Sequence, residues 1–211
     1  MPKPDVSDQR INMILAAARE LFAHHSLKEV KMQDIARQAG LSVGGVYWYF
    51  KSKDEIIRAL LTQNAETNIS ALKALSEMNI PARQRLQLFL DGVLNAAEGL
   101  RELYLTGAKY QAMSSPDIET RAEMEHIESG YRNGLENIIA QGVAGGEFIS
   151  INPKDVANAF IGAYEGLMLL WVMSPEKMHL KEAMQATAAL LLTGLTCPLT
   201  ENSPGNGETL R

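Results

Sequence analysis

The 211-residue sequence contains a single cysteine, Cys197, so it has no partner for a disulfide and no cysteine cluster for a metal ion. Only 6% of its residues are aromatic, and no segment offers the roughly 20 uninterrupted apolar residues of a membrane-spanning helix. The polar start, MPKPDVSDQR, lacks the apolar centre of a signal peptide. We therefore expect a cytoplasmic protein with no metal site and no membrane partner.

Signatures of an enzyme are missing as well. There is no glycine-rich phosphate loop, nucleophile elbow or paired-carboxylate constellation, so we expect no catalytic residues and no cofactor. The formal net charge is -5, yet residues 1–58 hold nine basic against seven acidic side chains, and the rest of the chain is acidic. This asymmetry favours contact with nucleic acid through the N-terminal part alone.

Helical periodicity dominates the chain, and no alternating β-branched runs bounded by hairpin signals appear, so the expected fold class is all-α. Apolar residues at spacings of three and four predict a first helix over 7–25. We expect a DNA-binding head over 1–53, a helical body over 54–197 and a disordered polar tail over 198–211.

The segment 32–53, MQDIARQAGLSVGGVYWYFKSK, has the pattern of a helix-turn-helix, expected over about 31–50. Ile35 and Ala36 fall on the inward face of a short helix, and the small Ala36 side chain allows the next helix to cross closely. Gly40 can adopt the left-handed conformation that ends the first of these helices, and Ser42 can cap the second.

The same segment resembles the N-terminal signature of the TetR family of bacterial transcriptional regulators. The pattern IA-x-x-AG-[LV]-S-x-x-x-[VL]-Y-x-[HY]-F-x-[ST]-K is matched by Ile35, Ala36, Ala39, Gly40, Leu41, Ser42, Val46, Tyr47, Tyr49, Phe50, Ser52 and Lys53. Ser26 and Lys31 depart from it, standing where the family usually has a glycine and a capping threonine. The resemblance implies a three-helix DNA-binding domain followed by a helical domain that binds an effector and dimerises.

The resemblance also implies DNA contacts at the start of the recognition helix and at the phosphates beside it. Gly44 and Gly45 would each cost on the order of 1 kcal/mol inside a helix, and close approach to DNA explains them. Val43 is expected to contact thymine methyl groups, with DNA shape contributing to specificity. Tyrosine hydroxyls and lysine ammonium groups supply donors to phosphates. The full candidate set is Lys31, Ser42, Val43, Gly44, Gly45, Tyr47, Trp48, Tyr49, Lys51 and Lys53.

Some of these positions have a competing interpretation. Phe50 is expected to pack the head rather than touch DNA. Trp48 fits either packing or contact, and Lys51 is evenly balanced between contact and a solvated helix start.

Two segments near the C-terminus, 159–173 (AFIGAYEGLMLLWVM) and 186–195 (ATAALLLTGL), are apolar around nearly their whole circumference. Such helices need cover on both sides, so we expect one side to face the chain's own core and the other to face a second copy. The predicted dimer interface comprises Gly162, Gly166, Leu169, Leu170, Ala188, Leu191, Leu192 and Leu195.

Aromatic and methionine side chains on predicted inward faces of the body outline a candidate effector pocket. For each one taken singly, packing in the core is the simpler explanation. Glu165 lies in an otherwise apolar helix, so it must be paired, protonated, at the dimer seam or facing a ligand. The candidate ligand residues are Tyr104, Tyr110, Met113, Met124, Tyr131, Phe160, Tyr164, Glu165, Met168 and Trp171.

These expectations combine into a homodimeric repressor that binds double-stranded DNA at a palindromic operator and is released by a partly hydrophobic small molecule. The alternative is a DNA-binding regulator, of repressing or activating type, controlled by a protein partner.

Overall fold

The computed structural model describes residues 6–99 and 118–196, where every regular element is a helix. The all-α prediction is confirmed. In chain order the helices are α1 (Val6–His24), α2 (Met32–Gln38), α3 (Val43–Tyr49), α4 (Lys53–Ser76), α5 (Ala82–Gly99), α7 (Ile118–Ala144), α8 (Pro153–Met173), the 3-10 turn η1 (Pro175–Lys177) and α9 (Leu180–Thr196). None of these described helices has the length and apolar content required to cross a membrane.

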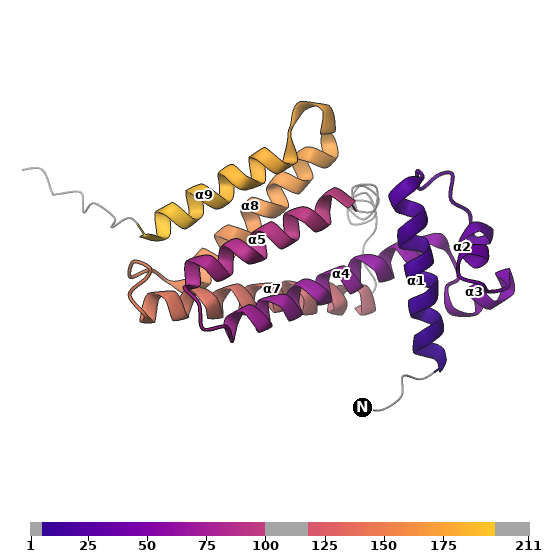
Figure 1. Cartoon of the computed structure of the whole chain (residues 1–211), viewed down its shortest axis with the longest axis horizontal. Helices are drawn as coiled ribbons and strands as arrows, with labels where there is room; N and C mark the ends of the chain where they lie inside the picture. Colours follow the sequence, from indigo (N-terminus) through magenta and orange to yellow (C-terminus); the bar gives the residue numbers. More distant parts are fainter. Residues whose placement is uncertain (1–5, 100–117, 197–211) are drawn as a thin grey trace, which may run out of the picture.

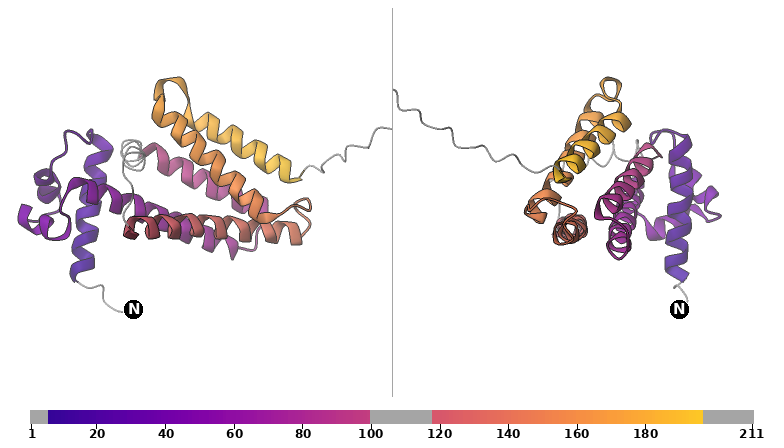
Figure 2. Two further views of the ribbon diagram at one scale, coloured as in Figure 1. Left: turned by 180° about the vertical axis from the view of Figure 1, so that it is seen from behind. Right: turned by 60° about the vertical axis from the view of Figure 1, so that its left-hand side comes forward.

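The helices form a small head at one end of an elongated molecule and a bundle at the other (Figure 1). The head consists of α1, α2 and α3, and α4 leaves it to run along the bundle. In the bundle, α4 packs against α7 and α5, α7 packs against α8, and α9 covers α8 and α5 (Figure 2). The predicted tail, 198–211, lies outside the described residues.

Each part has its own apolar core, and α4 contributes to both. The head's core combines residues of α1, α2 and α3 with Ile56, Ile57 and Leu60 of α4. Leu72, farther along α4, lies in the body's core with Leu86, Ile138, Ile139, Phe160 and Leu192. The head's core therefore extends beyond residue 53, the boundary expected from the sequence.

The helix-turn-helix forms as its residues predict. Gly40 has a φ of 68°, and the Leu41 amide donates to the Ala36 carbonyl at 2.9 Å, which closes the end of α2. The Ser42 side chain accepts a hydrogen bond from the Gly45 amide at 3.0 Å and so caps α3. Ser52 caps α4 in the same way, accepting from the Glu55 amide at 3.2 Å.

Two glycines of α7 allow α4 to approach closely. A Cβ added at Gly130 would lie 2.6 Å from Cδ1 of Ile69, and one added at Gly134 would lie 2.8 Å from Cβ of Leu72. Both distances are well inside van der Waals contact, so any larger residue forces a shift. These glycines set the spacing between α7 and the helix that carries the head.

Candidate functional site

The recognition helix α3 has one face in the head's core and one face in solvent. Val46 is fully buried, and Tyr49 is half-buried against the same core. On the other side Val43, Tyr47 and Trp48 are 37%, 44% and 77% exposed. Trp48 therefore does not pack in the head's core, which removes one of the two interpretations left open by the sequence, and its contact with DNA stays a prediction. Phe50, by contrast, is buried in the head's core as expected.

The two glycines of α3 differ in their surroundings. No atom lies within 4 Å of a Cβ built at Gly44, whereas one built at Gly45 would lie 3.1 Å from the Ser42 hydroxyl. Neither glycine has a positive φ. Gly44 is therefore required neither by its backbone conformation nor by packing within the chain.

A surface hollow of about 450 Å³ lies beside α3. Its lining comes from the α1–α2 connection, the start of α2, α3 and the start of α4, and comprises Lys28, Val30, Lys31, Met32, Gln33, Tyr47 and Lys53. Three lysines and a tyrosine around one hollow make it suited to an anionic group such as a phosphate. Lys28 and Gln33 were not predicted from the sequence, because only the fold brings them beside Tyr47.

Two of the predicted phosphate-binding lysines also hold the head together. The Lys53 ammonium donates to the carbonyls of Leu27 and Val30, the latter at 3.0 Å, and so ties the start of α4 to the α1–α2 connection. The Lys51 ammonium donates to the carbonyls of Tyr47 and Trp48 at 3.1 and 3.4 Å, at the C-terminal end of α3. Both ammonium groups are therefore placed by backbone oxygens.

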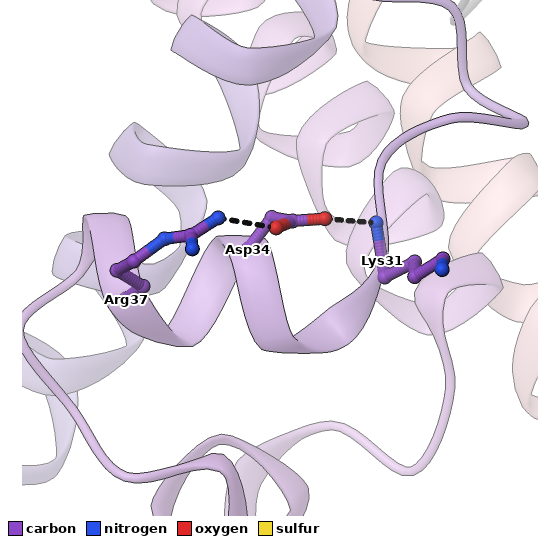
Figure 3. Close-up of polar contacts among 3 residues, drawn as sticks. All are labelled: Lys31, Asp34 and Arg37. Carbon is purple, nitrogen blue, oxygen red and sulfur yellow. Dashed lines mark hydrogen bonds and ion pairs between the residues drawn. The ribbon is translucent and has the colours of Figure 1, made fainter.

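The start of α2 is capped by Asp34 (Figure 3). Its carboxylate accepts a hydrogen bond from the Lys31 amide at 3.0 Å and pairs with the Arg37 guanidinium at 2.5 Å. The Lys31 side chain is exposed and points away from this carboxylate. Asp34 thus makes the half of a capping box in which the third helical residue accepts from the N-cap amide, while the cap that a threonine would make to the first amides of α2 is absent. Lys31 lines the hollow.

Ser26, the other departure from the family pattern, closes its turn by hydrogen bonds. Its hydroxyl and amide donate to the Glu29 carboxylate at 2.8 and 3.1 Å. These hydrogen bonds hold the pKa of Glu29 below its ordinary value, and the one from the hydroxyl has the larger effect. No non-glycine residue in the described part of the chain has a positive φ, so the turn needs no glycine here.

Comparison with known families covers both parts of the chain. Residues 14–60 match the family described as "Bacterial regulatory proteins, tetR family", and residues 82–196, more than half of the chain, match "BetI-type transcriptional repressor, C-terminal". The chain belongs to the TetR family. This TetR-family protein is a helix-turn-helix, DNA-binding transcriptional regulator, and the relatives and solved structures described next are regulators too.

Its relatives resemble it over most of their length. The fatty acid metabolism regulator protein of Bacillus subtilis is 24% identical over 86% of this chain and 93% of its own. The transcriptional regulator TtgR of Pseudomonas putida is 24% identical over 84% of this chain and 87% of its own.

Solved structures share the fold. The regulator FadR from Bacillus subtilis in complex with stearoyl-CoA matches with a TM-score of 0.64 and 24% identity, over 87% of this chain and 98% of its own. FadR from Thermus thermophilus in complex with lauroyl-CoA gives a TM-score of 0.63 and 19% identity, over 93% of this chain and 99% of its own.

The predicted effector residues fall in several places. Tyr164 and Met168 pack against the cluster that contains the buried Trp171, together with Leu94, Leu180 and Met184. Phe160 lies in the body's core, and Met124 is exposed. The Tyr131 hydroxyl accepts a hydrogen bond from Asn68 at 3.0 Å. Tyr104, Tyr110 and Met113 lie outside the described residues. The described part of the chain thus brings together Tyr164, Met168 and Trp171. Tyr164 also packs against the body's core, which contains Phe160 and against which Tyr131 packs.

A carboxylate acts on each of two neighbouring residues of α8, Tyr164 and Glu165. Burial, and then the negative charge of Asp91, raise the pKa of Tyr164 to about 12. Partial burial, and then the charge of Glu128, raise the pKa of Glu165 above its ordinary value. Glu165 itself lies on the exposed side of α8 with Gly162 and Gly166.

The predicted dimer residues divide into two groups. Gly162, Gly166, Leu169 and Leu170 are exposed on α8, and their place in a dimer interface stays a prediction. Ala188, Leu192 and Leu195 instead are buried in the protomer's own core, and Leu191 is half-buried against it, so this part of the predicted interface is corrected. The exposed apolar side chains nearby that the prediction omitted are Met173 (71% exposed) and Leu190 (75% exposed).

Proposed function

We propose that this TetR-family regulator is a homodimeric repressor whose two heads bind the half-sites of a palindromic operator until a small molecule binds the body. One observation carries the DNA-binding part: the exposed face of α3 lies beside a hollow lined by three lysines. A recognition helix needs an open face for the major groove and cationic groups beside it for the phosphates.

The contacts divide between these two surfaces. Ser42, Val43, Gly44 and Gly45 approach the base edges, since they form the first turn of α3 or its cap. Lys28 and Lys31 are exposed beside Tyr47 and bind phosphates across the hollow. Phosphate contacts fix the register of the protein on the duplex, and the α3 face selects the sequence.

Dimerisation uses the exposed apolar side chains of α8 and α9, which are Leu169, Leu170, Met173 and Leu190, together with the exposed Gly162 and Gly166. Large apolar side chains exposed together are unusual on a monomer and are typical of an interface. A two-fold axis between two such faces places the two recognition helices on one duplex.

The effector binds in the body next to Tyr164, Met168 and Trp171, where half-buried aromatic and methionine side chains suit a partly hydrophobic molecule. The two FadR structures hold stearoyl-CoA and lauroyl-CoA, so an acyl-CoA is the first effector to test. Release follows when the effector prefers a body conformation in which the heads no longer match the operator.

The test uses the full chain and fluorescently labelled duplexes from the region upstream of its own gene. We expect one or more duplexes to be bound with an affinity that falls steeply with salt, because several phosphates are neutralised. Lauroyl-CoA or stearoyl-CoA then lowers the affinity. A complete lack of salt-dependent binding contradicts the proposed function, and binding that ignores both acyl-CoAs contradicts only the choice of effector.

A further inference from the structure

The exposed face of α3 has no charged or amide side chain. The helix reads VGGVYWY, and its exposed residues fall in two neighbouring columns, one with Val43 and Tyr47 and one with Gly44 and Trp48. The Ser42 hydroxyl, at the start of the helix, already accepts a hydrogen bond from the Gly45 amide. The Tyr47 hydroxyl and the Trp48 indole N–H are the polar groups left on this face.

Such a face is poorly suited to reading base edges through hydrogen bonds. Guanine and adenine are recognised mainly by the forked donors and acceptors of Arg, Asn and Gln, and none of these residues occurs in α3. The apolar group in the major groove is the 5-methyl of thymine. An aliphatic or aromatic side chain recognises that group by contact.

The surroundings of Gly44 favour the same interpretation. It lies one helical turn before Trp48, and no atom lies within 4 Å of its missing Cβ. A duplex can therefore approach the backbone of α3 at this point, next to the exposed side chains of Val43 and Trp48. The lysines lie to the side, in the hollow, where they meet phosphates rather than bases.

We propose that this regulator selects its operator by contact of Val43 and Trp48 with thymine 5-methyl groups. This inference rests on the proposed DNA-binding function and specifies which chemical group the recognition helix reads. It assigns Trp48, exposed and without a role in the head's core, as a specificity-determining residue.

The experiment begins with a duplex enriched from a random library by the full-length protein. That duplex is then synthesised with uracil in place of thymine, which removes the methyl groups and leaves every base-pairing group intact. We expect affinity to fall about fourfold for each contacted methyl group, the factor that corresponds to exposing one buried methylene-sized group. Replacing single thymines locates the contacts.

Two variants separate methyl contact from other effects. Trp48→Ala is expected to bind the thymine duplex more weakly and to lose the preference for thymine over uracil at the positions that Trp48 contacts. Lys28→Ala, in the hollow, is expected to weaken both duplexes equally and to reduce the salt dependence.

The outcomes distinguish the two proposals. Equal affinity of the native protein for the thymine and uracil duplexes overturns the methyl-reading inference while DNA binding stands. A thymine preference that Trp48→Ala and Val43→Ala both retain unchanged also overturns it. Failure to enrich any duplex contradicts the proposed function itself.

Discussion

Gly44 is a residue whose presence the protein alone does not explain. It lies inside α3 with an ordinary helical backbone and open space around the position of its missing Cβ. A glycine inside a helix has a larger loss of backbone entropy than alanine on folding. The free protein therefore carries a cost that only a binding partner can offset.

Gly44→Ala is expected to stabilise the protein by about 0.5–1 kcal/mol and at the same time to weaken DNA binding. Urea unfolding and fluorescence anisotropy measure the two effects. Gly92→Ala is the matched control, since Gly92 lies in α5, also with no atom within 4 Å of its missing Cβ. Gly92→Ala should stabilise the protein by a similar amount and leave its DNA affinity unchanged. If Gly44→Ala also left DNA affinity unchanged, Gly44 would have no role in the close approach of DNA.

Glu165 provides a pH-dependent prediction. Its pKa is raised in the folded protein, so its stabilising contribution is complete below the ordinary glutamate pKa of 4.5 and is lost as the pH rises through the folded-state pKa. Glu165→Gln, which stays neutral, is expected to have a higher Tm than the native protein at pH 7, with the difference shrinking toward pH 4. A difference independent of pH would argue against desolvation of the carboxylate.

At the scale of single residues, the sequence predicts those features that depend on residues close by in the chain. The positive φ of Gly40 and the cap by Ser42 follow from residues three or four positions away. Lys53 and its partners Leu27 and Val30 are more than twenty residues apart in the chain, so this contact can be seen only in the folded structure. The same is true of Lys28, which lines the hollow together with Tyr47 and Lys53.

At the scale of elements, the packing of α4 on α7 is set by small residues. Gly134 faces Cβ of Leu72, an atom fixed to the backbone of α4. The atoms of Ile69 that face Gly130 (Cδ1, Cγ1 and Cγ2) all lie beyond Cβ and can move when the side chain rotates. The two glycines therefore respond differently to the same added methyl group.

Gly134→Ala is expected to destabilise the protein by about 1–3 kcal/mol, because the helices must separate, and Gly130→Ala by clearly less. Chemical unfolding of both variants under the same conditions measures the difference. Equal effects would mean that Ile69 is as constrained as Leu72.

The limits of sequence interpretation are clearest in α9. Its apolar residues occupy nearly the whole circumference, so periodicity alone does not say which side faces inward. The fold buries Ala188, Leu192 and Leu195 and leaves Leu190 exposed. By contrast, the limits of α8 were predictable, because Pro153 starts it and the 3-10 turn at Pro175 follows its end.

At the scale of the whole molecule, the proposed dimer depends on exposed apolar side chains of α8 and α9. Leu190→Glu is expected to give a monomer, since a carboxylate cannot be buried unpaired in an apolar interface. Light scattering after size-exclusion chromatography measures the mass. The control is Leu88→Glu, which changes an exposed leucine of α5.

The Leu190→Glu monomer should also bind the operator far more weakly, because the second head no longer binds as part of the same molecule. Leu88→Glu should remain dimeric and keep its affinity. A Leu190→Glu protein that stays dimeric would place the interface elsewhere.

The shared helix α4 has a consequence for how the protein unfolds. Its 24 residues supply Ile56, Ile57 and Leu60 to one core and Leu72 to the other. Melting α4 would remove buried side chains from both parts at once, so neither core can be lost while the other stays intact. We expect head and body to denature in a single cooperative transition, with coincident curves from probes placed in each.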